Sequence, residues 1–286
     1  MMPFRKIVYA VDFSQPCRAA APYVKDMVRH ESAELVVFHA FDVAPLMVEE
    51  AARLRSGNFL AYPELRRNEE AKLRGFAQEL FHDVHHEFQM EDGEPGVTIA
   101  RAIRRNGADL LMMPTHGHGP VRRFLLGSVT AKILHDADCP LWTVIDHGGE
   151  PRLPCRSVLC ALDFDGDAGA VAKAAGVLAR SRGASLCLAH SVEPPPAMWE
   201  ADYAAFRDEQ MARARRKLEA LRVETGMESA VDVVGAHAGE GVRGLAIKHG
   251  ADLIVIGRGR MQAAFGQYWS RIYSIVRDAP CPVLSI

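Results

Sequence analysis

Short apolar runs alternate with longer segments of helical periodicity along the first half of the chain. Each run has the length of a buried strand, and the runs lie at residues 7–11, 35–39, 88–90, 110–113 and 141–145. The intervening segments space their apolar residues as amphipathic helices do, at residues 12–30, 48–88, 97–106 and 128–135. This alternation predicts βαβ units and a parallel sheet flanked by helices.

The second half of the chain shows the same alternation. Its strand-like runs lie at residues 157–162, 185–190, 230–234, 253–256 and 283–286, and its helical patterns lie at residues 199–226 and 242–249. The two halves also match residue by residue, since KIVYAVDFS aligns with SVLCALDFD and GADLLMMP with GADLIVIG. The matched pairs are Asp12 with Asp163 and His39 with His190 at an offset of 151, Asp109 with Asp252 at 143, and Cys139 with Cys281 at 142. The sequence therefore predicts two copies of one domain, the second slightly shorter.

A glycine- and proline-rich segment separates the two copies. Residues 146–154 read DHGGEPRLP, a composition typical of a linker. We therefore expect two α/β domains, residues 1–146 and 155–286. Each should be a Rossmann-like, five-stranded parallel sheet flanked by helices.

Composition narrows the class of protein. The hydrophobic content of 49% and the charged content of 24% are those of an ordinary soluble globular protein. A net charge of −2 and a pI near 6.6 give no reason to expect nucleic acid or an anionic membrane as a partner. No apolar run reaches the length of a membrane span, and the first run is cut at Asp12, too short for a signal peptide. The six cysteines form no C-x-x-C pair, so we expect reduced thiols and a cytoplasmic protein.

One strand–loop–helix stretch carries the residues most suited to binding chemistry. The run ending at Met113 leads into a polar loop, residues 114–120, and Gly127 and Ser128 then open a helix. The free N–H groups and the positive end of the dipole attract an anion at such a helix start. Glycines at positions 117, 119 and 127 would let the backbone approach that anion closely. A phosphate site and a plain strand–helix turn both fit this stretch.

The same stretch resembles the phosphate loop of the universal stress protein family, which reads G-x-x-G, nine residues, then G-[ST]. Gly117 is followed here by nine residues and then by Gly127 and Ser128, but Pro114 stands in place of the first glycine. Proline lacks an N–H, so one phosphate donor is absent there. The resemblance covers nearly the whole chain. It implies a tandem protein with two Rossmann-like domains of the adenine nucleotide alpha hydrolase-like type.

The resemblance also implies which residues contact a nucleotide. Asp12 would contact adenine or ribose. The adenine pocket would be lined by Ala40 and Met113, and the phosphates would be held by Gly117, Gly127 and Ser128. Ligands in a doubly wound sheet bind beyond the carboxyl ends of the strands, where Asp12 and the loop would both lie. Taken alone, Asp12 fits equally well as the N-cap of the helix behind it.

The second copy lacks most of this pattern. Gly257 keeps the first glycine, but Trp269 stands where Gly127 lies in the first copy. An indole at that place would block a pyrophosphate, so we expect one nucleotide site per chain, in the first copy. Arg258 and Arg260 leave some other anion open for the second copy.

The sequence shows no catalytic signature. No Ser/His/Asp or Cys/His nucleophile pattern and no G-x-x-x-x-G-K-[ST] motif occur. His82, His85 and His86 have i, i+3, i+4 spacing on an expected helix, which suits either a metal or a solvated face. No further ligand set accompanies them, so we expect no metal site, and Mg²⁺ only together with ATP.

The resemblance implies a cytoplasmic stress-response protein that binds ATP or a related adenine nucleotide and is regulatory rather than metabolic. Slow ATPase or self-phosphorylation activity stays open, although the sequence identifies no general base for it. Two alternatives are a nucleotide-free interaction protein of the same fold, in which Pro114 has spoiled the site, and an adenylyl-transfer enzyme. Protein partners are not identified by the sequence.

The last strand of each copy should lie at a sheet edge. Exposed apolar edges offer unpaired N–H and C=O groups and are normally covered. Single-domain members of the family pair this edge between chains, so the resemblance implies that the two copies pair within one chain as a pseudo-dimer, with Trp142 buried near the seam. A further homodimer through another face stays open.

Overall fold

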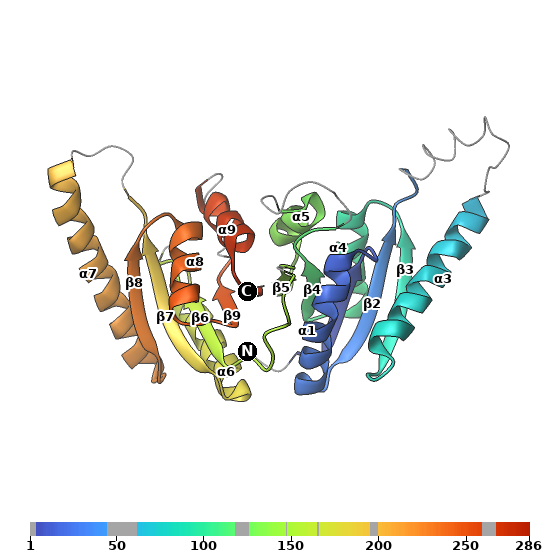
Figure 1. Ribbon diagram of the computed structural model, residues 1–286, viewed down its shortest axis with the longest axis horizontal. Coiled ribbons are helices and arrows are strands. Elements are labelled where there is room, and N and C mark those ends of the chain that lie inside the picture. The colour runs from blue at the N-terminus through green and yellow to red at the C-terminus, as the bar shows by residue number, and fades with distance from the viewer. Residues whose placement is uncertain are drawn as a thin grey trace. The chain divides into compact units, whose positions relative to one another are not determined.

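The computed structural model describes residues 4–44, 62–117, 126–146, 148–164, 166–194, 200–258 and 267–286. The chain contains two compact units. The N-terminal unit holds the described residues within 4–117 and 127–141, and the C-terminal unit holds Leu126 and the described residues within 142–286. Each unit is a sheet flanked by helices (Figure 1).

The N-terminal unit is built on four parallel strands in the order β3-β2-β1-β4. The chain moves outward from β1 to β3 and then returns to β4, so right-handed crossovers place α1 and α3 on one face and α4 and α5 on the other. The helices accordingly pack in these two pairs. The elements are β1 (Lys6–Val11), α1 (Gln15–Glu31), β2 (Glu34–Phe41), α3 (Tyr62–Phe81), β3 (His86–Asp92), α4 (Pro95–Asn106), β4 (Leu110–Pro114) and α5 (Ser128–Asp136).

The C-terminal unit has the strand order β5-β10-β9-β6-β7-β8, in which neighbours from β10 to β8 are parallel. Its elements are β5 (Leu141–Val144), β6 (Ser157–Ala161), α6 (Ala168–Arg182), β7 (Ser185–Val192), α7 (Glu200–Thr225), β8 (Ala230–Gly235), α8 (Ala238–Lys248), β9 (Leu253–Ile256), α9 (Gln267–Asp278) and β10 (Val283–Ser285). The α/β class and the parallel arrangement predicted from the sequence are thus confirmed.

The last strand of the first repeat groups with the second repeat. From Trp142 onward β5 belongs to the C-terminal unit, where the Oγ1 of Thr143 donates a hydrogen bond of 3.3 Å to the carbonyl of Val283. Leu141, the first residue of β5, is counted with the N-terminal unit. The boundary between the two compact units therefore falls inside β5, between Leu141 and Trp142.

Equivalent residues make equivalent contacts in the two repeats. The carboxylate of Asp109 accepts hydrogen bonds from the N–H groups of Arg5 and Lys6, at 2.8 and 3.1 Å. Asp252 accepts from the N–H groups of Arg156 and Ser157, at the start of β6, at the same two distances. These clamps join the start of the first strand of each repeat to the turn before its fourth strand. They confirm the internal repeat at the level of individual contacts.

Two sequence-based expectations about helices need correction. The helical pattern expected to reach residue 88 ends at Phe81, and β3 begins at His86. His82 and His85 therefore lie in the turn between the two elements, so the three histidines do not share a helix face. Helices α6 and α9 were not predicted. The expected segment 48–61 lies outside the described residues.

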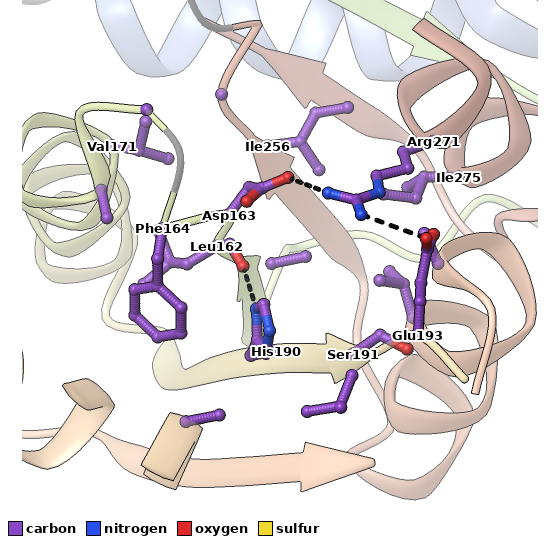
Figure 2. A pocket seen from close by; sticks show the side chains of 18 of the residues that line it. Leu162, Asp163, Phe164, Val171, His190, Ser191, Glu193, Ile256, Arg271 and Ile275 are labelled. Carbon is purple, nitrogen blue, oxygen red and sulfur yellow. Dashed lines mark hydrogen bonds and ion pairs between the residues drawn. The ribbon is translucent and has the colours of Figure 1, made fainter. Parts of the chain in front are cut away.

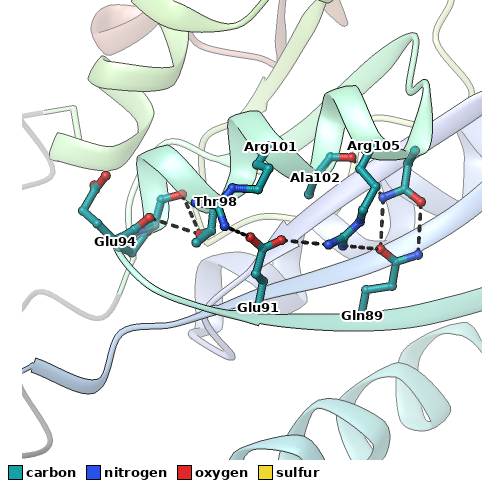
Figure 3. A network of polar contacts seen from close by, with 9 residues as sticks. Gln89, Glu91, Glu94, Thr98, Arg101, Ala102 and Arg105 are labelled. Atoms are coloured by element: carbon teal, nitrogen blue, oxygen red, sulfur yellow. Dashed lines mark hydrogen bonds and ion pairs between the residues drawn. The ribbon is translucent and has the colours of Figure 1, made fainter.

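A polar network fixes α4 on the edge strand β3 (Figure 3). The carboxylate of Glu91 pairs with Arg101 and with Arg105, the latter at 2.9 Å. Arg105 also donates to Gln89, which exchanges two 3.0 Å hydrogen bonds with Asn106. Charged side chains along an edge strand discourage pairing with another chain. The network is therefore a structural feature of this edge.

Two features are absent from the residues that the structure describes. Within those residues no cluster of three His, Cys, Asp or Glu side chains is arranged to hold a metal ion. No described helix combines the length and the apolar character needed to cross a lipid bilayer.

Candidate functional site

The sheet register places the predicted site residues of the first repeat at one edge. Val11 pairs with His39, so Asp12 lies level with Ala40, the next residue of β2. On the other side of β1, Tyr9 pairs with Met112, which brings the loop after β4 level with Asp12. The crossovers reverse direction between β1 and β4, and such a switch point is where doubly wound sheets bind ligands.

Ala40 and Met113 share one face of this sheet. The register puts Met113 level with Ala10 and therefore with Phe38, and Ala40 follows Phe38 by two residues. Residues two apart in a strand point to the same face. Met113 is 5% exposed and Ala40 is half-buried, so both can border an apolar space at the strand ends.

Asp12 is held by its own turn. Its Oδ1 accepts hydrogen bonds from the N–H of Ser14 at 3.0 Å and from the Sγ of Cys17 at 3.1 Å. Ser14, not Asp12, occupies the N-cap position of α1, and its side chain makes no capping bond. The N-cap interpretation of Asp12 is therefore wrong. Phe13 between them adopts a left-handed φ of 64°, which turns the chain at the end of β1.

Cys17 was not predicted as part of this site. Burial, and then the negative charge of Asp12, raise the pKa of its thiol to about 12. The thiol consequently keeps its proton at neutral pH and can donate it to Asp12. The sequence signal was a cysteine in the first turn of the helix behind Asp12, a position that spacing alone does not mark as special.

Gly117 lies against the carboxylate of Asp12. A Cβ placed on Gly117 would be 2.1 Å from the Oδ2 of Asp12, a distance that no side chain can occupy. The glycine therefore permits the loop after β4 to reach the end of β1. The expected meeting of Asp12 with this loop is present in the structure.

Gly127 and Ser128 begin α5, as predicted. Gly127 is the N-cap, with no side chain to cap the helix, and Ser128 is exposed. The N–H of Gly127 donates to the carbonyl of Thr115 at 2.9 Å, so it is not available to a phosphate. The N–H groups of Ser128 and the next residues of the first turn have no partner within the helix. These are the donors that an anion would meet.

Pro114 ends β4 and is buried. Its carbonyl accepts a hydrogen bond of 3.1 Å from the Oγ1 of Thr130, on the first turn of α5. The departure from the family pattern thus removes a donor but leaves the strand tied to the helix start. Residues 118–125 lie outside the described part of the chain.

The second repeat contains a cavity of about 430 Å³ at the corresponding strand ends (Figure 2). Asp163, Ser191 and Ile256 line it, and they are the sequence equivalents of Asp12, Ala40 and Met113. The expectation that Trp269 would block a pyrophosphate in this repeat remains a prediction, because that side chain is outside the described residues. The cavity nevertheless shows that open space exists where the sequence suggested a lost site.

Arg271 of α9 bridges two carboxylates in this cavity (Figure 2). Its guanidinium donates to Asp163 at 3.0 Å and to Glu193 at 3.1 Å. Burial alone would lower the pKa of Arg271, but its bonds to Glu193 and Asp163 outweigh burial and raise it. The equivalent residue of the first repeat is Val129. The repeats therefore differ at the carboxylate that the family resemblance marks for base or ribose.

His39 and His190 hold the same position in the two repeats. The Nδ1 of His39 lies 2.8 Å from the carbonyl of Val11, and that of His190 lies 2.7 Å from the carbonyl of Leu162. Burial lowers the pKa of both imidazoles, so both are neutral at pH 7 and donate from Nδ1. The shared hydrogen bond to the end of the neighbouring strand indicates a structural role for both histidines.

Comparison with known proteins adds to this geometry. The sequence profile of the Universal stress protein family matches the chain twice, over residues 3–144 and 154–286. The chain belongs to the universal stress protein family. Both repeats are thus family domains, as the sequence resemblance implied, and the family is one of stress-response proteins.

Individual relatives agree with this assignment. The chain is 30% identical over 145 residues to universal stress protein MJ0531 of Methanocaldococcus jannaschii, covering 49% of this chain and 82% of the relative. It is 31% identical over 142 residues to a Thermus aquaticus universal stress protein encoded in the QAH/OAS sulfhydrylase 3′ region, covering 49% of this chain and 98% of the relative. These relatives span about one repeat.

Solved structures match the tandem arrangement. A universal stress protein from Archaeoglobus fulgidus superposes with a TM-score of 0.71 at 19% identity, over 100% of this chain and 97% of that one. A putative universal stress protein from Pseudomonas aeruginosa gives 0.65 at 15% identity, over 100% and 94%. At these identities the likeness concerns the fold.

Proposed function

We propose that the first repeat binds ATP or a related adenine nucleotide, and that this binding is regulatory rather than metabolic. The observation that carries the proposal is the contact between Gly117 and the Asp12 carboxylate. It joins the acid expected to contact adenine or ribose to the loop expected to hold the phosphates. The nucleotide would lie across the strand ends between them.

The residues present fit such a ligand. Oδ1 of Asp12 is used by Ser14 and Cys17, and Oδ2 lies on the side of the glycine loop. The first turn of α5 offers N–H donors at the positive end of a helix dipole. Ala40 and Met113 would border the base, and Mg²⁺ would enter together with the phosphates. We assign no catalytic residue, and we place the protein in the cytoplasm.

Calorimetric titration with ATP tests the proposal. We expect one ATP per chain and its loss in Gly127→Trp, because even a Cβ at residue 127 would lie 3.1 Å from the carbonyl of Thr115. Far-UV circular dichroism controls for folding of that variant. Protein purified without added ligand should also release an adenine nucleotide on denaturation.

Other outcomes would favour the alternatives. The absence of ATP binding would support the nucleotide-free interaction protein. This alternative is favoured by two missing phosphate donors: Pro114 has no N–H, and the N–H of Gly127 is bonded to Thr115. Two equivalent sites, or binding that survives in a folded Gly127→Trp variant, would contradict the single-site proposal. Transfer of AMP to an acceptor would favour an adenylyl-transfer enzyme.

A further inference from the structure

The cavity of the second repeat has a large apolar part. Strand β9 and the helices around it contribute buried aliphatic side chains, and Phe164 adds a ring that packs 4.7 Å from the ring of His190. The buried aliphatic lining residues include Ala214, Val242, Ile256, Ile272 and Ile275. A volume of about 430 Å³ is within the range of small-molecule sites.

The polar end of this cavity does not suit a nucleoside triphosphate. Arg271 already spans Asp163 and Glu193, so Asp163, the equivalent of Asp12, is engaged by a guanidinium of the same repeat. These three groups together carry one net negative charge. A polyphosphate placed beside them would meet repulsion, and a base would have to displace an ion pair.

Two further cations line the cavity from α7. Arg213 and Lys217 are one turn apart on α7, both line the cavity and both are exposed. The Nζ of Lys217 lies 4.6 Å from the centre of the Phe164 ring. One acid, Asp167, also lines this region, and its Oδ1 accepts from the N–H of Ala170 at the start of α6. The balance of these three side chains is one positive charge, next to an aromatic ring.

We propose that this cavity binds a small aromatic monoanion, such as an aryl carboxylate. Its rings would fill the apolar part against Phe164, and its carboxylate would lie at Arg213 and Lys217. A carboxylate would pair with the two cations of α7, because Arg271 is already paired with Asp163 and Glu193. Rings that replace water against aliphatic walls supply the apolar contribution. The second repeat would thus have a ligand of its own, different in chemistry from that of the first.

Titration of the full chain with 2-naphthoate tests this proposal. We expect one binding event per chain with a dissociation constant below about 1 mM, and at least tenfold weaker binding of the neutral analogue 2-naphthalenemethanol. Arg213→Gln with Lys217→Gln should weaken 2-naphthoate binding about tenfold or more. Arg216→Gln is the matched control, because Arg216 is an exposed cation of the same helix outside the lining; its affinity should equal that of the wild type.

Location and independence are tested with two further variants. Ala214→Phe should fill the apolar part and abolish 2-naphthoate binding, with circular dichroism as the check on folding. Gly127→Trp should leave 2-naphthoate binding unchanged, so that failure of the nucleotide proposal does not affect this one. The proposal is overturned by no saturable binding up to several millimolar, by equal binding of the neutral analogue, by an equal loss in Arg216→Gln, or by competitive displacement of 2-naphthoate with ATP.

Discussion

The carboxylate of Asp12 and the backbone of Gly117 touch, although 104 residues separate them in the chain: a Cβ on Gly117 would be 2.1 Å from Oδ2. The contact joins the end of β1 to the loop after β4, across the switch point of the sheet. Any side chain at residue 117 must displace the carboxylate. The orientation of Asp12 therefore depends on the absence of a side chain there.

Gly117→Ala should weaken ATP binding about tenfold with little loss of stability. The clashing atom is the end of a side chain, so Asp12 can rotate away, but it then loses its place at the loop. Calorimetric titration gives the affinity, and urea unfolding gives the stability. Gly75→Ala is the control, because a Cβ there meets no atom within 4 Å; its ATP affinity should not change. Wild-type affinity in Gly117→Ala would show that the contact is incidental.

Asp12→Ala should weaken ATP binding by about ten- to a hundred-fold and leave the fold intact. Loss of a hydrogen bond to a charged group costs about 1.5–3 kcal/mol, which corresponds to this range. The repeat-matched control is Asp163→Ala, whose effect on ATP affinity should be negligible. An unchanged affinity in Asp12→Ala would mean that Asp12 only shapes the turn before α1.

Sequence patterns predicted the framework better than the sites. The apolar runs of β1 and β4 are legible because these strands are buried on both faces, and even the half-exposed β3 was found. Helix α6 escaped prediction because small residues such as Ala172 and Ala175 form its buried face, which leaves little contrast between its sides. The bridge from Arg271 to Asp163 joins residues 108 apart, and no local spacing announces it. The predicted nucleotide contacts, from Asp12 to Ser128, came instead from the resemblance to a family.

Stability should depend on Asp232 in a pH-dependent way. This largely buried residue of β8 accepts hydrogen bonds from Lys248 at 2.6 Å and His249 at 2.8 Å. Burial alone would raise the pKa of Asp232, but these bonds outweigh it and hold the pKa below its ordinary value. A carboxyl with a lowered folded-state pKa stabilises the fold above its unfolded-state pKa, and this stabilisation is lost as the pH falls through the folded-state pKa.

Asp232→Asn should therefore lower the free energy of unfolding by about 1–3 kcal/mol at pH 7. The difference from the wild type should shrink as the pH is lowered below about 4. Urea unfolding at a series of pH values measures both quantities. Asp138→Asn is the control: its carboxylate is 74% exposed and lies 3.4 Å from Arg104, so its removal should change little. A difference that stays constant down to pH 3 would exclude the charge of Asp232 as the cause.

The final prediction concerns β5, which lies beside β10 within the C-terminal unit. Trp142 on this strand is 3% exposed, and the Oγ1 of Thr143 donates to the carbonyl of Val283. A fragment that ends within residues 146–154 keeps β5 but loses β10. Its apolar edge would then offer unpaired N–H and C=O groups to solvent or to another chain. We therefore expect the isolated first repeat to dimerise or aggregate at tens of micromolar, which sedimentation measures directly.

Fluorescence adds a residue-level readout to the same fragment. The other two tryptophans, Trp199 and Trp269, lie in the second repeat, so Trp142 is the only tryptophan that remains. If β5 regains cover by pairing with a second fragment, the Trp142 emission stays blue-shifted and moves to the red on dilution. The full-length variant with Trp199→Phe and Trp269→Phe is the control, and its emission should not depend on concentration. The prediction is contradicted if the fragment stays a folded monomer with a buried Trp142, since β5 would then be stable without β10.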